Sequence, residues 1–280
     1  MTNSKGKESL KDKVKEAFEL IDQGFKQITT SEQYKKFLAF SSRFYNYSLK
    51  NQLLIWTQYP NASYVAGFVE WKKMGRYVKK GEKGIKILAP IHIRTTQNDN
   101  GEEKVIEYNR YRTISVFDIS QTVGEPVPSL KGFIKTVPGD TAIYEMMKKV
   151  SPFPVEELDD CGGADGYYNL MTKDIKIWSQ KPTAHRLLTL IHEIAHGVLH
   201  SDRKVSPGHK VMEIEAEAVG FVVCHALGID ASMNSMGYLL YFGGDSTMSL
   251  IEDSRERINL AAKTILNALE NAYMPELSKA

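Results

Sequence analysis

The sequence His192-Glu193-Ile194-Ala195-His196 decides which fold the second half of this chain can adopt. It has the form H-E-x-x-H, and on a helix this form puts two imidazoles one turn apart with a carboxylate beside them. Two histidines at this spacing can supply two ligands to a zinc ion, and the glutamate can act as a base next to it. The stretch therefore predicts a metal site, provided that it lies on a helix.

The residues around this stretch have the periodicity of an amphipathic helix. Apolar residues recur at i, i+3, i+4 and i+7 over residues 184–199, which predicts one buried face. Thr183 is an acceptable N-cap for this helix. Because His192 and His196 lie at the margin of the apolar stripe, they can point into a cleft. The alternative is a pair of half-buried histidines that bind no metal.

A catalytic zinc site needs a third protein ligand and one position left open for water. Three carboxylates follow on a second predicted helix, over about residues 210–227 and ending at Gly228: Glu213, Glu215 and Glu217. Glu213 is the predicted third ligand, and Glu217, one turn on, is predicted to steady a histidine ligand, although these two roles could be exchanged. Glu215 projects to the opposite side and is expected to be solvated. The alternative is that all three only solvate the start of the helix.

The segment before the motif helix predicts a β-hairpin. Gly166-Tyr167-Tyr168 leads through a turn at residues 171–173 into Ile175-Lys176-Ile177-Trp178. The second of these strands alternates apolar and polar residues, which is typical of a strand with one buried face.

The motif together with Glu213-x-x-Ala216-Glu217 resembles the gluzincin arrangement of the ImmA/IrrE-type metallopeptidases and of the C-terminal domain of ArdC-like antirestriction proteins. The resemblance implies hydrolysis of a peptide bond, with an extended peptide docked along the strand next to the motif helix. It also implies three Zn²⁺ ligands and a general base, which are His192, His196, Glu213 and Glu193 respectively.

The chain departs from the pattern of this family at one position. It also lacks the pattern of a related family, the metzincins. An Asn or Asp often stands four residues after the ligand glutamate, where this chain has Glu217. The metzincin pattern fails, because its required Gly and His are replaced by Leu199 and Asp202. His200 lies about 12 Å along the helix from His192 and cannot share its metal. The donor to a developing oxyanion stays open among five residues: Tyr167, Tyr168, His200, His209 and His225.

The charge of the chain is distributed unevenly. Residues 1–130 contain 21 Lys and Arg against 14 Asp and Glu, whereas residues 131–280 contain 15 against 20. The boundary falls in a stretch rich in Pro and Gly. We therefore predict an α+β protein of two domains, residues 1–125 and 140–280, joined by a linker over 126–139. The basic first domain indicates an anionic partner.

The segment from Trp71 to Lys86 contains seven basic residues and one acid, mixed with aromatic residues and glycines. Cations along a backbone together with aromatic faces are what sequence-tolerant binding of single-stranded nucleic acid uses. The alternative is a lysine-rich surface that serves only solubility. Residues 44–56 predict an aromatic-rich helix, whose apolar residues could belong to the core.

Several short sequences in this half closely resemble the N-terminal single-stranded-DNA-binding domain of ArdC-like proteins, over about residues 10–125. They include Tyr47-Ser-Leu-Lys-Asn-Gln-Leu-Leu-Ile55, Val65-Ala-Gly-Phe68 and Val116-Phe-Asp-Ile-Ser-Gln121. The resemblance implies a protein of a plasmid, conjugative element or phage that protects incoming DNA from restriction. We expect phosphate contacts from Lys72, Lys73, Arg76, Lys79, Lys80 and Lys83, and base stacking on Trp71 and Tyr77.

Three hypotheses for the function follow. In the first, single-stranded DNA brings a zinc peptidase to a host restriction or regulatory protein. In the second, the protein is a non-catalytic antirestriction protein whose zinc domain is structural or binds a partner; a third makes the first half a protein-interaction module. The two cysteines, Cys161 and Cys224, form no disulfide framework, which favours a reducing cytoplasm. No apolar run approaches membrane-spanning length, so we expect no membrane partner.

Overall fold

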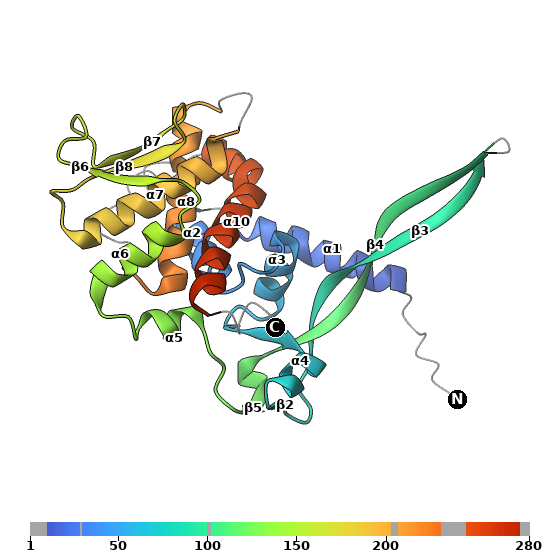
Figure 1. Cartoon of the computed structure of the whole chain (residues 1–280). Coiled ribbons are helices and arrows are strands. Elements are labelled where there is room, and N and C mark those ends of the chain that lie inside the picture. The colour runs from blue at the N-terminus through green and yellow to red at the C-terminus, as the bar shows by residue number, and fades with distance from the viewer. Residues whose placement is uncertain (1–9, 29, 100–101, 203–206, 231–244, 275–280) are drawn as a thin grey trace, which may run out of the picture. The chain divides into compact units, whose positions relative to one another are not determined.

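The computed structural model describes residues 10–28, 30–99, 102–202, 207–230 and 245–274. The chain divides into two units, the first made of Met1–Gln27 and Lys50–Glu125 and the second of Ile28–Leu49 and Pro126–Ala280. Each unit combines helices and strands, which agrees with the α+β class (Figure 1). The division differs from the predicted limits at residues 28–49, which belong with the second unit.

The first unit is built around two antiparallel sheets. Strand order in the larger sheet is β1-β4-β3, and β3 pairs with β4 from Ile85 opposite Val116 to Asp99 opposite Glu102. The smaller sheet pairs β2 with β5. The elements are α1 (Leu10–Lys26), α3 (Leu49–Gln58), β1 (Val65–Gly67), α4 (Phe68–Lys73), β2 (Arg76–Val78), β3 (Ile85–Asp99), β4 (Glu102–Asp118), the 3-10 helix η1 (Ile119–Gln121) and β5 (Thr122–Gly124).

Two side chains of α3 cap the free edge of β3. The Asn51 amide donates to the Leu88 carbonyl at 2.9 Å, and its oxygen accepts from the Leu88 amide at 2.9 Å. Gln58 makes the same pair of bonds to Lys86, at 2.8 and 2.9 Å. An open strand edge leaves backbone donors and acceptors unpaired, so these amides satisfy the edge and hold α3 against the sheet.

The predicted aromatic helix begins later than its sequence indicates. The helix α3 starts at Leu49, whereas Phe44 and Tyr45 lie before it and are buried in the second unit. The turn at residues 41–47 is closed by backbone bonds such as Tyr47 N–H to the Phe44 carbonyl at 2.8 Å. These aromatic residues are core, which was the alternative prediction.

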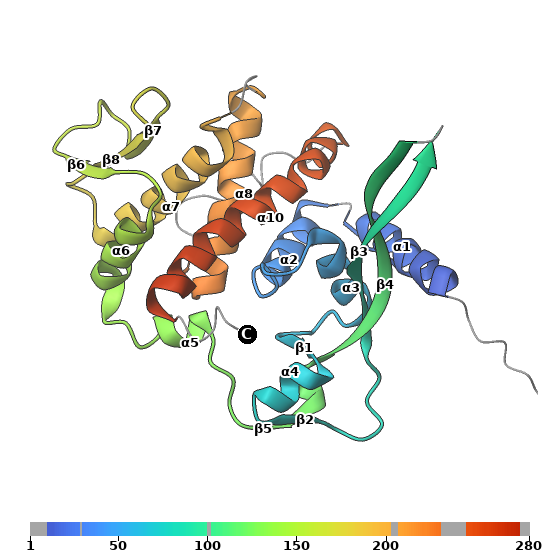
Figure 2. The same ribbon diagram turned by 45° about the vertical axis from the view of Figure 1, so that its right-hand side comes forward.

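The second unit packs helices around the motif helix, with a small mixed sheet beside it (Figure 2). Strand β8 lies in the middle of this sheet, parallel to β6 and antiparallel to β7. The elements are α2 (Ser31–Ser41), α5 (Leu130–Ile134), α6 (Gly139–Val150), β6 (Val155–Leu158), β7 (Gly166–Asn169), β8 (Asp174–Trp178), α7 (Thr183–His200), α8 (His209–Leu227) and α10 (Asp245–Tyr273).

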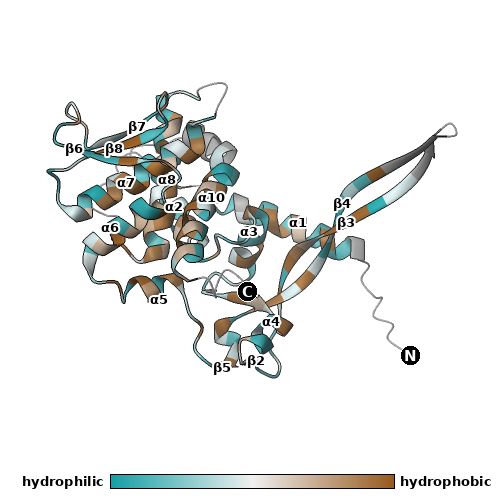
Figure 3. Ribbon diagram, in the orientation of Figure 1, coloured by the Kyte–Doolittle hydropathy of each residue, from teal (hydrophilic) through white to brown (hydrophobic). Residues whose placement is uncertain are grey.

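The two predicted helices and the hairpin are present. Helix α7 begins at Thr183, with Pro182 rather than Thr183 at the cap position, and α8 ends at Gly228, whose φ of 76° is left-handed. Ile175 and Ile177 of β8 are fully buried while their neighbours are not, as the alternation predicted. Figure 3 shows hydrophobic and hydrophilic residues alternating around α7 and α8. Strand β6 was not predicted.

The predicted linker is part of the second unit. Residues 126–139 include α5, whose Leu130 and Ile134 are buried and which contacts α8. The Ser129 hydroxyl caps this helix by accepting from the Gly132 amide at 3.1 Å. Both cysteines are free thiols, and none of the helices in the described ranges is long and apolar enough to cross a membrane.

Candidate metal centre

Three predicted ligands converge from two helices. The Nε2 atoms of His192 and His196, on α7, are 3.0 Å apart. Glu213, on α8, places its Oε2 3.4 Å from His192 Nε2 and its Oε1 3.4 Å from His196 Nε2. All three candidate ligand atoms lie within 4.8 Å of one another, and this is the one such cluster of three or more groups among the residues that the structure describes.

This cluster fits a divalent metal ion. Two imidazoles and one carboxylate are a common ligand set for catalytic zinc. The side chains are only 23%, 12% and 20% exposed for His192, His196 and Glu213, so water screens them little. Burial alone would raise the pKa of Glu213, but the hydrogen bonds and charges of the two histidines outweigh it and hold this pKa well below its usual range. The carboxylate is therefore ionised and available as a ligand.

Glu193 lies beside the ligands and is held by the neighbouring strand. Its side chain is buried, and its Oε2 accepts from the Tyr168 backbone amide at 2.8 Å. Ile175, the β8 residue opposite Tyr168, donates its own amide to the Pro154 carbonyl at 2.8 Å. Burial raises the pKa of Glu193 above its ordinary value, although the charges of both histidines act to lower it. A carboxylate with a raised pKa is a stronger base, as proton abstraction requires.

A cavity of about 370 Å³ opens over the cluster. It is lined by Gly166, Tyr167, Tyr168, Leu170, His192, Glu193, His196, His200, His209, Met212 and Glu213. The strand bordering it is β7, one of the two edge strands of its sheet. Both β7 and β8 contact the motif helix, but β6 and β7 occupy both edges of β8, so of these two strands only β7 could pair with a further strand. Docking of an extended peptide there stays a prediction.

The cavity narrows the set of oxyanion donors. His225 lies outside the cavity, with its Nδ1 2.9 Å from the Ser42 hydroxyl. His200 lines the cavity but is 4% exposed, and the Tyr168 hydroxyl is buried. Tyr167 and His209 remain accessible, and His209 Nε2 lies 3.7 Å from Glu213 Oε1.

The prediction for Glu215 was wrong. Its side chain is completely buried and accepts hydrogen bonds from Ser254 Oγ at 2.5 Å and Arg257 Nε at 3.1 Å, both on α10. His200 Nδ1 lies 3.7 Å from the same carboxylate. The opposite side of α8 is therefore covered by α10, and this contact joins residues about forty positions apart, which no local pattern indicates.

Glu217 is buried, as its place in the apolar row of α8 indicated. Its charge acts on His192: burial alone would lower the pKa of this histidine, but the hydrogen bond to Glu213 and the charges of nearby carboxylates, Glu217 included, raise it. The steadying role of Glu217 stays a prediction.

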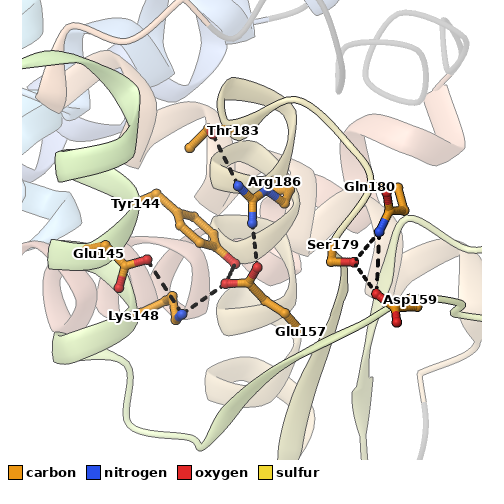
Figure 4. A network of polar contacts seen from close by, with 9 residues as sticks. All are labelled: Tyr144, Glu145, Lys148, Glu157, Asp159, Ser179, Gln180, Thr183 and Arg186. Carbon is orange, nitrogen blue, oxygen red and sulfur yellow. Dashed lines mark hydrogen bonds and ion pairs between the residues drawn. The ribbon is translucent and has the colours of Figure 1, made fainter.

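A polar network that sequence analysis missed anchors the start of α7 (Figure 4). Glu157 of β6 accepts from Arg186 of α7, from Lys148 Nζ at 2.9 Å and from the Tyr144 hydroxyl at 3.3 Å. Arg186 also donates to Thr183 Oγ1 at 3.2 Å. The network ties α6, β6 and α7 together two turns before His192, and so fixes the helix that carries the ligands.

Two of the eight predicted DNA contacts are buried in the first unit. Trp71 is fully buried and its indole N–H donates to the Phe117 carbonyl at 2.9 Å. Arg76 is 9% exposed and donates to Thr122 Oγ1 at 2.8 Å and to the Gly124 carbonyl at 3.0 Å. Both side chains therefore stabilise the unit, contrary to the prediction. The other six are exposed: Lys72, Lys73, Tyr77, Lys79, Lys80 and Lys83.

The chain thus combines an α+β unit that exposes a lysine-rich segment with a unit that carries a candidate metal centre of two histidines and a glutamate. Residues 6–117 match the family model described as the N-terminal domain of anti-restriction factor ArdC. This confirms the resemblance of the N-terminal part, which is ArdC-like; the metallopeptidase likeness of the second unit stays a prediction.

Similarity to individual proteins extends further along the chain. The uncharacterised protein pXO2-81 of Bacillus anthracis is 26% identical over 95% of this chain, which spans 53% of that protein's length. The metal-free crystal structure of antirestriction protein ArdC from plasmid R388 is 21% identical, with a TM-score of 0.48 over 80% of this chain and 83% of that one. The corresponding values for its Mn(II)-bound structure are 19%, 0.45, 80% and 84%.

Proposed function

We propose that this protein is an ArdC-like antirestriction protein in which a single-stranded-DNA-binding unit accompanies a zinc-dependent peptidase unit. The observation that carries the peptidase proposal is the convergence of His192, His196 and Glu213 beside the buried Glu193, at the floor of a cavity. Purely structural zinc sites are closed by four protein ligands, whereas three ligands facing a cavity leave a position for water.

The residues divide the work of peptide hydrolysis. A bound zinc ion would lower the pKa of its water to about 7 and polarise the substrate carbonyl. Glu193 would accept a proton from the attacking water on its carboxylate and transfer it to the leaving amine. The Tyr168 amide holds this carboxylate in place, and Tyr167 or His209 would donate to the oxyanion. An extended substrate would add to the free edge of β7.

The first unit would supply the affinity for DNA. Its exposed lysines can neutralise phosphates, and such contacts make affinity fall steeply with salt. A protein that protects incoming DNA acts where that DNA arrives, in the bacterial cytoplasm, and a plasmid, conjugative element or phage would encode it. The substrate of the second unit would be a host restriction or regulatory protein.

A non-catalytic metal centre is the second candidate. Its support is that the three ligands link α7 to α8, so a metal ion would cross-link the two helices whether or not hydrolysis follows. In that case DNA binding alone would protect against restriction.

The first experiment measures metal content by elemental mass spectrometry in wild type and His196→Ala, after zinc or manganese is supplied and excess removed. We expect about one ion per wild-type chain and none in the variant. Zinc should displace manganese, because imidazole and carboxylate ligands bind Zn²⁺ more tightly. Absence of metal from both proteins would refute the metal centre.

The second step compares wild type with Glu193→Gln, which keeps all three ligands. Both are incubated with a peptide mixture from a digested bacterial lysate, and new peptide ends are counted by mass spectrometry. The proposal expects metal-dependent cleavage by wild type only. A Glu193→Gln variant that binds zinc and still protects DNA from restriction would support the non-catalytic candidate instead.

A further inference from the structure

Four large apolar side chains of the first unit are strongly exposed on elements that contact one another. Phe68 and Val69 of α4 are 58% and 64% exposed, Tyr77 of β2 is 58% exposed and Val123 of β5 is 53% exposed. Every other large apolar side chain described as exposed in this unit reaches only 37–38%. We call these four residues the apolar patch. Exposed apolar groups gathered in this way mark a binding surface more often than chance.

The strand register explains half of the patch. Tyr77 and Val123 stand directly opposite each other in the antiparallel pair of β2 and β5. Residues opposite each other in a sheet project from the same face. Their neighbours Arg76 and Thr122 are buried on the other face. The two-stranded sheet therefore has one buried face and one face that presents a tyrosine and a valine to solvent.

The buried face gives the patch a rigid support. The Arg76 guanidinium bonds to Thr122 and to the Gly124 carbonyl, and lies 5.8 Å from the centre of the Trp71 ring. Gly124 has φ 136°, and a Cβ there would lie 2.2 Å from the Gly75 carbonyl oxygen, so β5 passes very close to the turn before β2. A surface held in this way loses little conformational entropy on binding.

Lysines with exposed side chains lie close to the patch along the chain, and we call them the rim lysines: Lys72, Lys73, Lys79, Lys80 and Lys83. Three acids lie on the same elements or directly next to them, Glu70, Glu82 and Glu125, of which Glu70 pairs with Lys73 at 2.7 Å. Five cations against three acids leave an excess of positive charge beside the exposed aromatic side chains. A single strand fits this chemistry, because it exposes base faces that a duplex hides.

We propose that the apolar patch is the base-contacting surface for single-stranded DNA, with bases stacked on Tyr77 and Phe68 and the rim lysines on the phosphates. This rests on the proposed DNA binding of the first unit. In this proposal Tyr77 and Phe68, rather than Trp71, stack on the bases. Trp71 and Arg76 belong to the buried support of the patch.

The test measures binding of a fluorescent 20-mer of thymidine to the full chain by anisotropy, at several salt concentrations. Tyr77→Ser and Phe68→Ser should each weaken binding about 5- to 150-fold without changing the salt slope, and Tyr77→Phe should retain wild-type affinity. Lys79→Gln/Lys80→Gln should reduce the salt slope by about 0.7 per lost phosphate contact. Tyr108→Ser, on β4 outside the patch, is the matched aromatic control and should bind like wild type.

Three outcomes would overturn the proposal. If wild type shows no salt-dependent binding, the DNA-binding function falls together with the patch. If wild type binds and the patch variants bind equally well, the DNA function stands, and the patch serves a protein partner or none. If Tyr77→Ser and Phe68→Ser lost as much affinity for a duplex as for the 20-mer, base stacking on these residues would be excluded. Circular dichroism checks folding, and footprinting of wild type gives an independent test, since the oligonucleotide should protect Phe68 and Tyr77 from hydroxyl radicals.

Discussion

Gly197 follows the second histidine of the motif and leaves space for an aromatic ring. A Cβ at this position would lie 2.3 Å from Phe153 Cε2 and 2.8 Å from two further ring atoms. The ring cannot move away freely, because its other contacts include Tyr168, with ring centres 4.9 Å apart. Gly197 is therefore required for close packing, and the packing supports the strand whose amide holds Glu193.

Gly197→Ala should destabilise the second unit by about 1–3 kcal/mol, the usual effect of overpacking. The matched control is Gly220→Ala on α8, where a Cβ would meet nothing within 4 Å. Alanine is preferred to glycine inside a helix, so this control should gain about 0.5–1 kcal/mol. Urea unfolding measures both. A Gly197→Ala variant as stable as the Gly220→Ala variant would contradict the packing argument. Adding Phe153→Leu to Gly197→Ala should restore part of the lost stability.

At the scale of elements, the Glu157 network joins α6 and β6 to the ligand helix. The Glu157 side chain is 27% exposed, and Lys148 and Arg186 carry the opposing charges. Burial alone would raise the pKa of Glu157, but the hydrogen bonds and charges of these partners lower it below its ordinary value of 4.5. A carboxyl group whose pKa is lower in the folded state stabilises the fold when it is ionised.

Glu157→Gln should therefore lower the free energy of unfolding by about 1–3 kcal/mol at pH 7, since bonds to a charged acceptor are lost. The contribution is fully present above pH 4.5 and disappears as the pH falls through the lower folded pKa, so wild type and variant should converge in acid. Denaturant unfolding between pH 7 and pH 3.5 measures this. Glu156→Gln, whose side chain is 61% exposed, is the control and should change stability by less than about 1 kcal/mol. A difference that persists unchanged at pH 3.5 would contradict the ionic origin.

At the scale of the whole molecule, the candidate metal centre lies within one unit only. A ligand that binds the folded state protects the structure that contains its site, and at one hundred times its dissociation constant it slows opening about 100-fold. Zinc should therefore slow hydrogen exchange of backbone amides in α7 and α8 and leave β3 and β4 of the first unit unchanged. Mass spectrometry of exchanged peptides measures this, with His196→Ala as the control that should not respond. Equal slowing in both units would show that they open together.

The sequence by itself determined what depends on neighbours along the chain. The helices α7 and α8, the end of α8 at Gly228 and the β7–β8 hairpin follow from periodicity and turn residues, which act over a few positions. The His192–His196 pair follows for the same reason, because one helical turn sets its geometry. Glu213 was predicted as the third ligand because its side chain lies in an apolar row of the second helix.

The tertiary structure decided which side of each element is covered. Lysine-rich surroundings indicated that Trp71 and Arg76 were exposed, yet the strand pair of β2 and β5 buries them and turns Tyr77 outward. Glu215 appeared to lie on a solvated side until α10 covered it. Residues 28–49 joined the second unit, although their neighbours on both sides belong to the first. Burial depends on segments that are distant in sequence, and their approach is set by the packing of the whole chain rather than by any local pattern.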